Sequence, residues 1–82
     1  MKLLITVIVP AISRQFDILV PRDLKIRSIT PLIAETVEEL SNHMYVATGQ
    51  EFFCSVEKNS LLRQNETLES YGIQNGDHLI MT

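Results

Sequence analysis

The sequence is poor in the residues on which most metal and redox sites depend. Its 82 residues include one cysteine, two histidines and no tryptophan. A lone cysteine excludes an internal disulfide and is typical of a reducing compartment. Together with two histidines far apart in sequence it makes a poor zinc set, so His43 and His78 are predicted to be surface or turn residues. We expect no metal and no cofactor.

An excess of positive charge and a long apolar run are also missing. Seven basic residues against ten acidic ones give a net charge of −3, whereas nucleic-acid phosphates select clustered Lys and Arg. No stretch reaches the roughly 18 apolar residues of a membrane span, so neither nucleic-acid binding nor membrane insertion is expected. The apolar N-terminus leads into strand-like alternation from Phe16 to Val20 and is not predicted to be a signal peptide. These features favour the cytoplasm.

What the sequence does contain is sufficient for a packed core. The apolar content of 45% is ordinary for a globular protein and well above that of disordered chains. No linker, internal repeat or low-complexity segment divides the chain, so residues 1–82 are predicted to form a single domain.

The N-terminal part has the pattern of a β-hairpin. Lys2 to Val9 is rich in β-branched residues, and a turn from Pro10 leads to a second strand from Arg14 to Val20. Alternation predicts that Leu4, Ile8 and Leu19 lie on the outer face of the sheet. The residues predicted to face the core are Leu3, Ile5, Val7, Val9, Phe16, Ile18 and Val20.

An apolar stripe at helical spacing follows the hairpin. Its members are Ile26, Ile29, Ile33, Val37 and Leu40. Pro31 lacks an N–H and is tolerated only near a helix start, so Ser28 is predicted to be the N-cap. Acidic residues lie off the stripe, where a solvated face explains them better than acid–base chemistry: Glu35, Glu38 and Glu39.

The second half of the chain predicts three more strands. These are Gln50 to Val56, Ser60 to Leu62 and Leu79 to Met81, whereas no structure is predicted for residues 41–50 beyond a frayed helix end and a loop. Cys54 is predicted to be a small buried hydrophobe in the first of these strands, because a reactive thiol needs electropositive, partly exposed surroundings.

A closing stretch, T-L-E-S-Y-G-I-Q from Thr67 to Gln74, combines several local signals. Thr67 can cap a single helical turn through Leu68 to Tyr71, and Gly72 stands where the turn must reverse with positive φ. Ile73 then enters the core. The ring of Tyr71 can be buried only if its hydroxyl finds a backbone partner.

The order hairpin, helix, strand, short strand, turn, strand predicts an α+β domain. One main helix covers one face of a mixed sheet of four to five strands, and a short helical turn precedes the last strand. For the first and last strands to be central, they must pair in parallel. This order and the closing stretch resemble ubiquitin, which implies a ubiquitin-like β-grasp fold.

Two further motifs resemble a narrower family. F-D-I-L-V-P from Phe16 to Pro21 precedes Leu24-Lys25-Ile26 and the helix, and I-x-x-G-D-x-L runs from Ile73 to Leu79. Both are similar to the YukD/EsaB group, the small ubiquitin-like accessory proteins of type VII secretion systems in Gram-positive bacteria. The resemblance implies a cytoplasmic adaptor or regulatory component that binds secretion-system proteins noncovalently. It supplies no catalytic residues.

Two alternatives to this function stay open. One is a self-associating or generic ubiquitin-like scaffold module. The other, less favoured, is a sulfur carrier or protein modifier, because those relatives end in Gly-Gly whereas this sequence ends on its last predicted strand at Thr82. No glycine-rich phosphate loop is present, since Asn75-Gly76-Asp77 has turn chemistry, and an enzyme is not expected.

The outer face of the predicted sheet is the candidate protein-binding surface. If the first and last strands are neighbours, one apolar surface is expected there, and Leu19 marks its margin. A surface of this kind often binds a protein partner or a second copy of the chain as a homodimer. Scattered surface aliphatics are the alternative explanation. The candidate residues are Leu4, Ile8, Leu19, His78 and Ile80.

Overall fold

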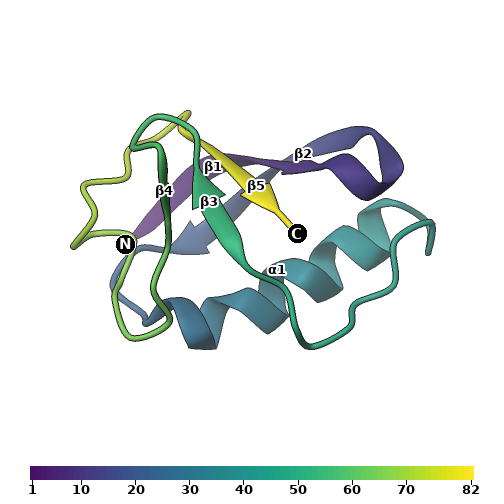
Figure 1. Cartoon of the computed structure of the whole chain (residues 1–82), viewed down its shortest axis with the longest axis horizontal. Coiled ribbons are helices and arrows are strands. Elements are labelled where there is room, and N and C mark those ends of the chain that lie inside the picture. The colour runs from purple at the N-terminus through teal and green to yellow at the C-terminus, as the bar shows by residue number, and fades with distance from the viewer.

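One α-helix lies across one face of a five-stranded sheet (Figure 1), in a computed structural model that describes residues 1–82. The elements in chain order are β1 (Lys2–Val9), β2 (Arg14–Pro21), α1 (Ile26–Leu40), β3 (Phe53–Ser55), β4 (Ser60–Leu61) and β5 (His78–Met81). The strand order is β2-β1-β5-β3-β4, and β1 pairs with β5 in parallel. The predicted α+β ubiquitin-like β-grasp fold and the parallel pairing are therefore confirmed.

The face of the sheet that packs against α1 forms a single core with the helix. Seventeen buried apolar side chains make one cluster. The alternating residues of β1 from Leu3 to Val9 are at most 4% exposed, as their parity predicts. Phe16 is only partly buried and packs against the edge of the cluster. Each fully buried aliphatic side chain contributes about 1.5–3 kcal/mol relative to its exposed state.

Helix α1 begins before the position that the sequence predicts. Lys25 is the N-cap, and the predicted cap at Ser28 is wrong. The N–H groups of Ile26 and Arg27 donate to the carbonyl oxygens of Glu66 and Gln64 at 2.8 and 3.0 Å. Because a distant loop satisfies the free donors of the first turn, no side-chain cap is needed there. Pro31 consequently lies inside the helix.

The end of the helix also differs from the predicted stripe. Leu40 is 51% exposed, whereas Ser41 is fully buried. The next buried residue after Val37 is therefore Ser41, four positions on, and not Leu40, three positions on. Ser41 can occupy this position because its hydroxyl donates to the Glu38 carbonyl and accepts the N–H of Tyr45.

Strands β3 and β4 are shorter than predicted. Phe52 and Thr82 exchange two backbone hydrogen bonds, so pairing extends one residue beyond β3 and β5. The preceding residues leave the sheet because they form a turn around Glu51. The hairpin turn contains a short 3-10 helix, Pro10–Ile12, that the sequence did not predict.

The closing stretch forms most of the predicted contacts. The Thr67 hydroxyl accepts the N–H of Ser70 at 2.9 Å, and the Tyr71 hydroxyl accepts the N–H of Arg63 at 2.8 Å. Gly72 has φ of +72° and Ile73 is buried. The predicted helical turn from Leu68 is realised as hydrogen-bonded turns rather than as a regular helix.

Two carboxylates hold the loop of residues 41–50, for which the sequence predicts no structure. The buried Glu51 carboxylate accepts the Tyr45 hydroxyl at 2.6 Å and the N–H groups of Thr48 and Gly49 at 2.7 and 3.1 Å. Glu38, predicted to be solvated, is partly buried and accepts the N–H of Ala47 at 2.9 Å. That hydrogen bond, more than the contact with His43, lowers the pKa of Glu38.

Burial of the Glu51 carboxyl would by itself raise its pKa. Hydrogen bonds from the Thr48 N–H and the Tyr45 hydroxyl outweigh burial and hold the pKa of Glu51 below its ordinary value of 4.5. Burial and the adjacent Glu51 carboxylate raise the pKa of Tyr45 from 10.0 to about 12. The ionised Glu51 therefore stabilises the fold above the pKa of the unfolded chain, and this contribution is lost as pH falls through the lower folded pKa.

We expect Glu51→Gln to lower the free energy of unfolding at neutral pH by about 1–3 kcal/mol, because loop donors lose a charged acceptor. Urea denaturation measures the loss, with Glu35→Gln on the exposed face of α1 as control. The difference between wild type and Glu51→Gln should shrink as pH falls below 4.5. Equal stability at neutral pH, or a difference unaffected by acid, would contradict this role.

Candidate protein-binding face

The sheet face turned away from α1 carries a row of mainly apolar side chains across four strands. Ile8 of β1 lies opposite Ile80 of β5, Ile80 lies opposite Cys54 of β3, and Cys54 lies opposite Leu61 of β4. Directly opposed residues in a sheet project from the same face, so these four side chains are neighbours. We name Ile8, Ile80, Cys54 and Leu61 the Ile80 row.

The Ile80 row is accessible at its β4 end. Leu61 is 56% exposed, while the other three residues are partly buried. An open hollow of about 300 Å³ lies beside it, and its apolar lining comes from Cys54, Val56, Leu61 and Ile80. Val56 is 47% exposed. Exposed aliphatic side chains beside a hollow are typical of a protein-binding surface, because a side chain of the partner can fill the hollow.

A polar row runs beside the Ile80 row on the same face. The Thr6 hydroxyl donates to the Asp17 carboxylate at 2.8 Å, and Thr6 lies opposite His78. Glu57 accepts the His78 N–H at 2.8 Å, and its other oxygen lies 2.6 Å from the His78 ring nitrogen Nδ1. The hydrogen bonds from the ring and from the N–H lower the pKa of Glu57. The polar row therefore carries carboxylates at both ends.

The predicted residues all lie on this face, but they do not form the one continuous apolar surface that we expected. Leu4 and Leu19 oppose each other beyond the polar row and are 44% and 60% exposed. Ile8 and Ile80 belong to the Ile80 row, and His78 belongs to the polar row. The bond between Thr6 and Asp17 and the pair of His78 with Glu57 divide the face into two apolar groups.

Three further residues belong to this face, although the sequence did not predict it: Cys54, Val56 and Leu61. Cys54 was predicted to be buried, whereas the structure leaves it partly exposed in the Ile80 row. Its neighbour Phe53 is 1% exposed and points into the core, so alternation along β3 turns Cys54 outward. That parity was available in the sequence. The register that places Cys54 beside Ile80 depends on pairing with a distant strand and was not.

Outside this face, the second histidine forms a single side-chain contact. His43 lies 3.2 Å from the Glu38 carboxylate at the end of α1. No three His, Cys, Asp or Glu side chains gather in a way that could hold a metal ion. No helix has both the length and the apolar character needed to cross a lipid bilayer.

Comparison with known proteins places the chain among secretion proteins. A family model described as WXG100 protein secretion system (Wss), protein YukD, matches residues 4–81. No curated protein matches the chain.

Solved structures of similar fold include ubiquitin-like domains of mycobacterial secretion proteins. The ubiquitin-like domain of the type VII secretion system protein ECCD1 of Mycobacterium tuberculosis aligns with a TM-score of 0.80 at 14% identity, covering 100% of this chain and 98% of that chain. The EccD5 ubiquitin-like domain from Mycobacterium xenopi gives 0.75 at 17% identity, covering 100% and 93%. Protomer 1 of the ESX-3 core complex gives 0.76 at 17% identity, and the aligned part is 16% of that chain. At these identities the likeness is one of fold.

Substitutions at the adjacent positions 53 and 54 of β3 test whether the side chain of Cys54 points to the outer face of the sheet. We expect Cys54→Ser to change the free energy of unfolding by no more than about 0.5 kcal/mol, as is usual at a surface position. Phe53→Ala should cost about 3–5 kcal/mol, because it leaves a cavity in the core. Urea denaturation of both variants measures the contrast, and comparable losses would contradict the outward orientation of Cys54.

Proposed function

Since the chain belongs to the YukD family of the WXG100 protein secretion system, we propose that it is a noncovalent adaptor or regulatory component of a type VII secretion system. It acts in the cytoplasm through protein–protein contacts and is not an enzyme. The similar fold within a protomer of the ESX-3 core complex supports partners that are proteins of the secretion machinery.

The observation that carries this proposal is the Ile80 row. The inner face of the sheet is already covered by α1, whereas no element covers the outer face (Figure 1). Exposed aliphatic side chains at Leu61 and Val56 would lose contact with water on docking, which favours association. The hollow beside them can receive a side chain of the partner.

Charges at the border of this row indicate what the partner contributes. Asp17 and Glu57 terminate the polar row, and hydrogen bonds from the His78 ring and N–H lower the pKa of the Glu57 carboxyl. A partner surface with aliphatic residues at its centre and Lys or Arg at its rim complements this arrangement. Rim charges of this kind steer association and select partners more than they add affinity.

Capture from cells that produce the protein tests the proposal. We expect wild type to recover secretion-system components, and the double variant Leu61→Glu with Ile80→Glu to recover at least about tenfold less, because it buries charge at the centre of the contact. Mass spectrometry identifies and quantifies the captured proteins.

Leu40→Glu provides a matched control, since Leu40 is a similarly exposed leucine at the end of α1. Circular dichroism should show that each variant is folded. Equal recovery by wild type and the double variant would contradict the proposed surface. If only the protein itself is recovered, self-association becomes the better account of the exposed row.

A further inference from the structure

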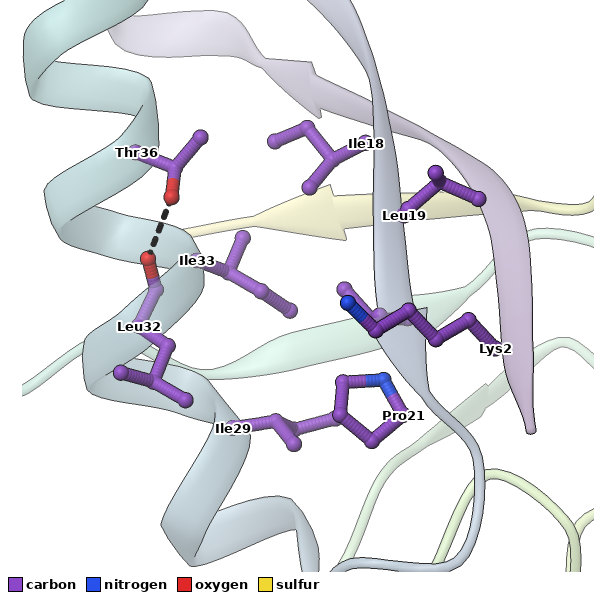
Figure 2. A pocket seen from close by; sticks show the side chains of 9 residues that line it. Lys2, Ile18, Leu19, Pro21, Ile29, Leu32, Ile33 and Thr36 are labelled. Atoms are coloured by element: carbon purple, nitrogen blue, oxygen red, sulfur yellow. Dashed lines mark hydrogen bonds between the residues drawn. The ribbon is translucent and has the colours of Figure 1, made fainter.

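A groove separates the edge strand β2 from helix α1 (Figure 2). Its volume is about 210 Å³. Ile18, Val20 and Pro21 line it from β2, and Ile29, Leu32 and Ile33 line it from α1. The groove is apolar and too small for a drug-sized ligand or cofactor, whose pockets usually measure about 300–1,000 Å³. A cavity of this size suits an aliphatic side chain.

The groove has a closed floor and an exposed rim. Ile29 and Ile33 are 1% exposed and belong to the core, so the floor is fixed by packing. Leu32 on α1 is 54% exposed and stands at the rim, whereas the side chain of Leu19 on β2 points to the outer face of the sheet. Figure 2 shows Leu32 beside the groove, on the same helical turn that carries Ile33. An entering side chain would therefore bury Leu32 further.

The backbone beside the groove is open to hydrogen bonding. β2 is an edge strand of the sheet. The pairing of β1 with β2 continues one residue beyond the strands, where Met1 lies opposite Arg22. The N–H of Arg22 donates to the carbonyl oxygen of Met1, so these two residues form a hydrogen-bonded pair. Because hydrogen-bonded pairs alternate along an antiparallel ladder, the backbone groups of Gln15, Asp17 and Leu19 point away from β1 toward the open edge. An edge of this kind is a template for an added strand.

Basic side chains flank β2 at both ends, whereas Asp17 within it lies on the outer face and accepts the Thr6 hydroxyl. Arg14 and Arg22 stand at its two ends, and Lys2 reaches the groove from β1 (Figure 2) without forming an ion pair. Arg22 has only a loose, exposed contact with Glu69, at 3.8 Å. Arg14, Arg22 and Lys2 outnumber the two acidic residues beside this strand, Asp17 and Asp23. An acidic segment complements this edge.

We propose that this edge binds an extended, acidic segment of a partner protein, which adds a strand beside β2 and inserts an aliphatic side chain between β2 and α1. A second copy of the chain fits less well, because antiparallel pairing along the whole of β2 would place Arg14 of one copy beside Arg22 of the other. The site is separate from the Ile80 row, whose most exposed residue, Leu61, lies on the opposite edge strand, β4.

A synthetic peptide tests this inference on the full chain. The probe is fluorescent Asp-Asp-Val-Thr-Leu-Thr-Val-Glu-Glu, whose alternation directs its apolar residues to one side. We expect saturable binding in fluorescence anisotropy, weakened at least about tenfold by Leu32→Glu, which places a charge at the rim. Lys2→Glu with Arg22→Glu should weaken binding and reduce its dependence on salt.

Amide NMR shifts should change at Gln15, Asp17 and Leu19. Leu40→Glu and Leu61→Glu serve as controls, because both leucines are exposed outside the groove, and they should bind like wild type. The inference is overturned if no saturable binding occurs up to about 1 mM peptide. It is also overturned by equal binding of a Lys-flanked peptide, by unchanged binding to Leu32→Glu, or by shifts at β2 that depend on protein concentration alone, which indicate a second copy.

Discussion

The parallel pairing of β1 with β5 is the contact on which the other features depend. It joins segments separated by almost the whole chain, as the bond from the Leu4 N–H to the Asn75 side chain, 71 positions apart, illustrates. On the inner face, it places Val7 beside Leu79 in the core; on the outer face, it places Ile8 beside Ile80. A slip of one residue would turn Leu79 outward and Ile80 inward, so burial of the core fixes the register of the binding face.

Local patterns predicted most of the strands and the helix, and the resemblance of their order and of the closing stretch to ubiquitin implied the fold. The alternation of apolar residues predicted β1 and the residues of the hairpin that face the core. The residue types of the closing stretch predicted the hydrogen bonds of Thr67 and Tyr71. The start of α1 was not predictable in this way, because carbonyl groups of the loop at Gln64 and Glu66 replace a local cap. The loop of residues 41–50 depends on Glu51, whose carboxylate gathers donors that have no sequence periodicity.

The binding face was predicted less completely. Alternation along a strand shows which face of the sheet a residue occupies, but it does not show which residues of other strands lie beside it. Leu4 and Ile80 share the outer face, yet the contact of Thr6 with Asp17 lies between their rows. Leu61 belongs beside Ile80 only through two successive strand pairings, from β5 to β3 and from β3 to β4. Nothing in the local sequence of β4 specifies those pairings.

The proposed function requires the Ile80 row to contact a component of the secretion machinery in the cell. A photo-crosslinking amino acid in place of Leu61, compared with the same group in place of Leu40, tests it directly, since both leucines are more than half exposed on different surfaces. If the Ile80 row makes this contact, covalent adducts with a secretion-system protein form from the position of Leu61 and not from that of Leu40. Adducts from the Leu40 position alone, or none from the Leu61 position, would contradict it.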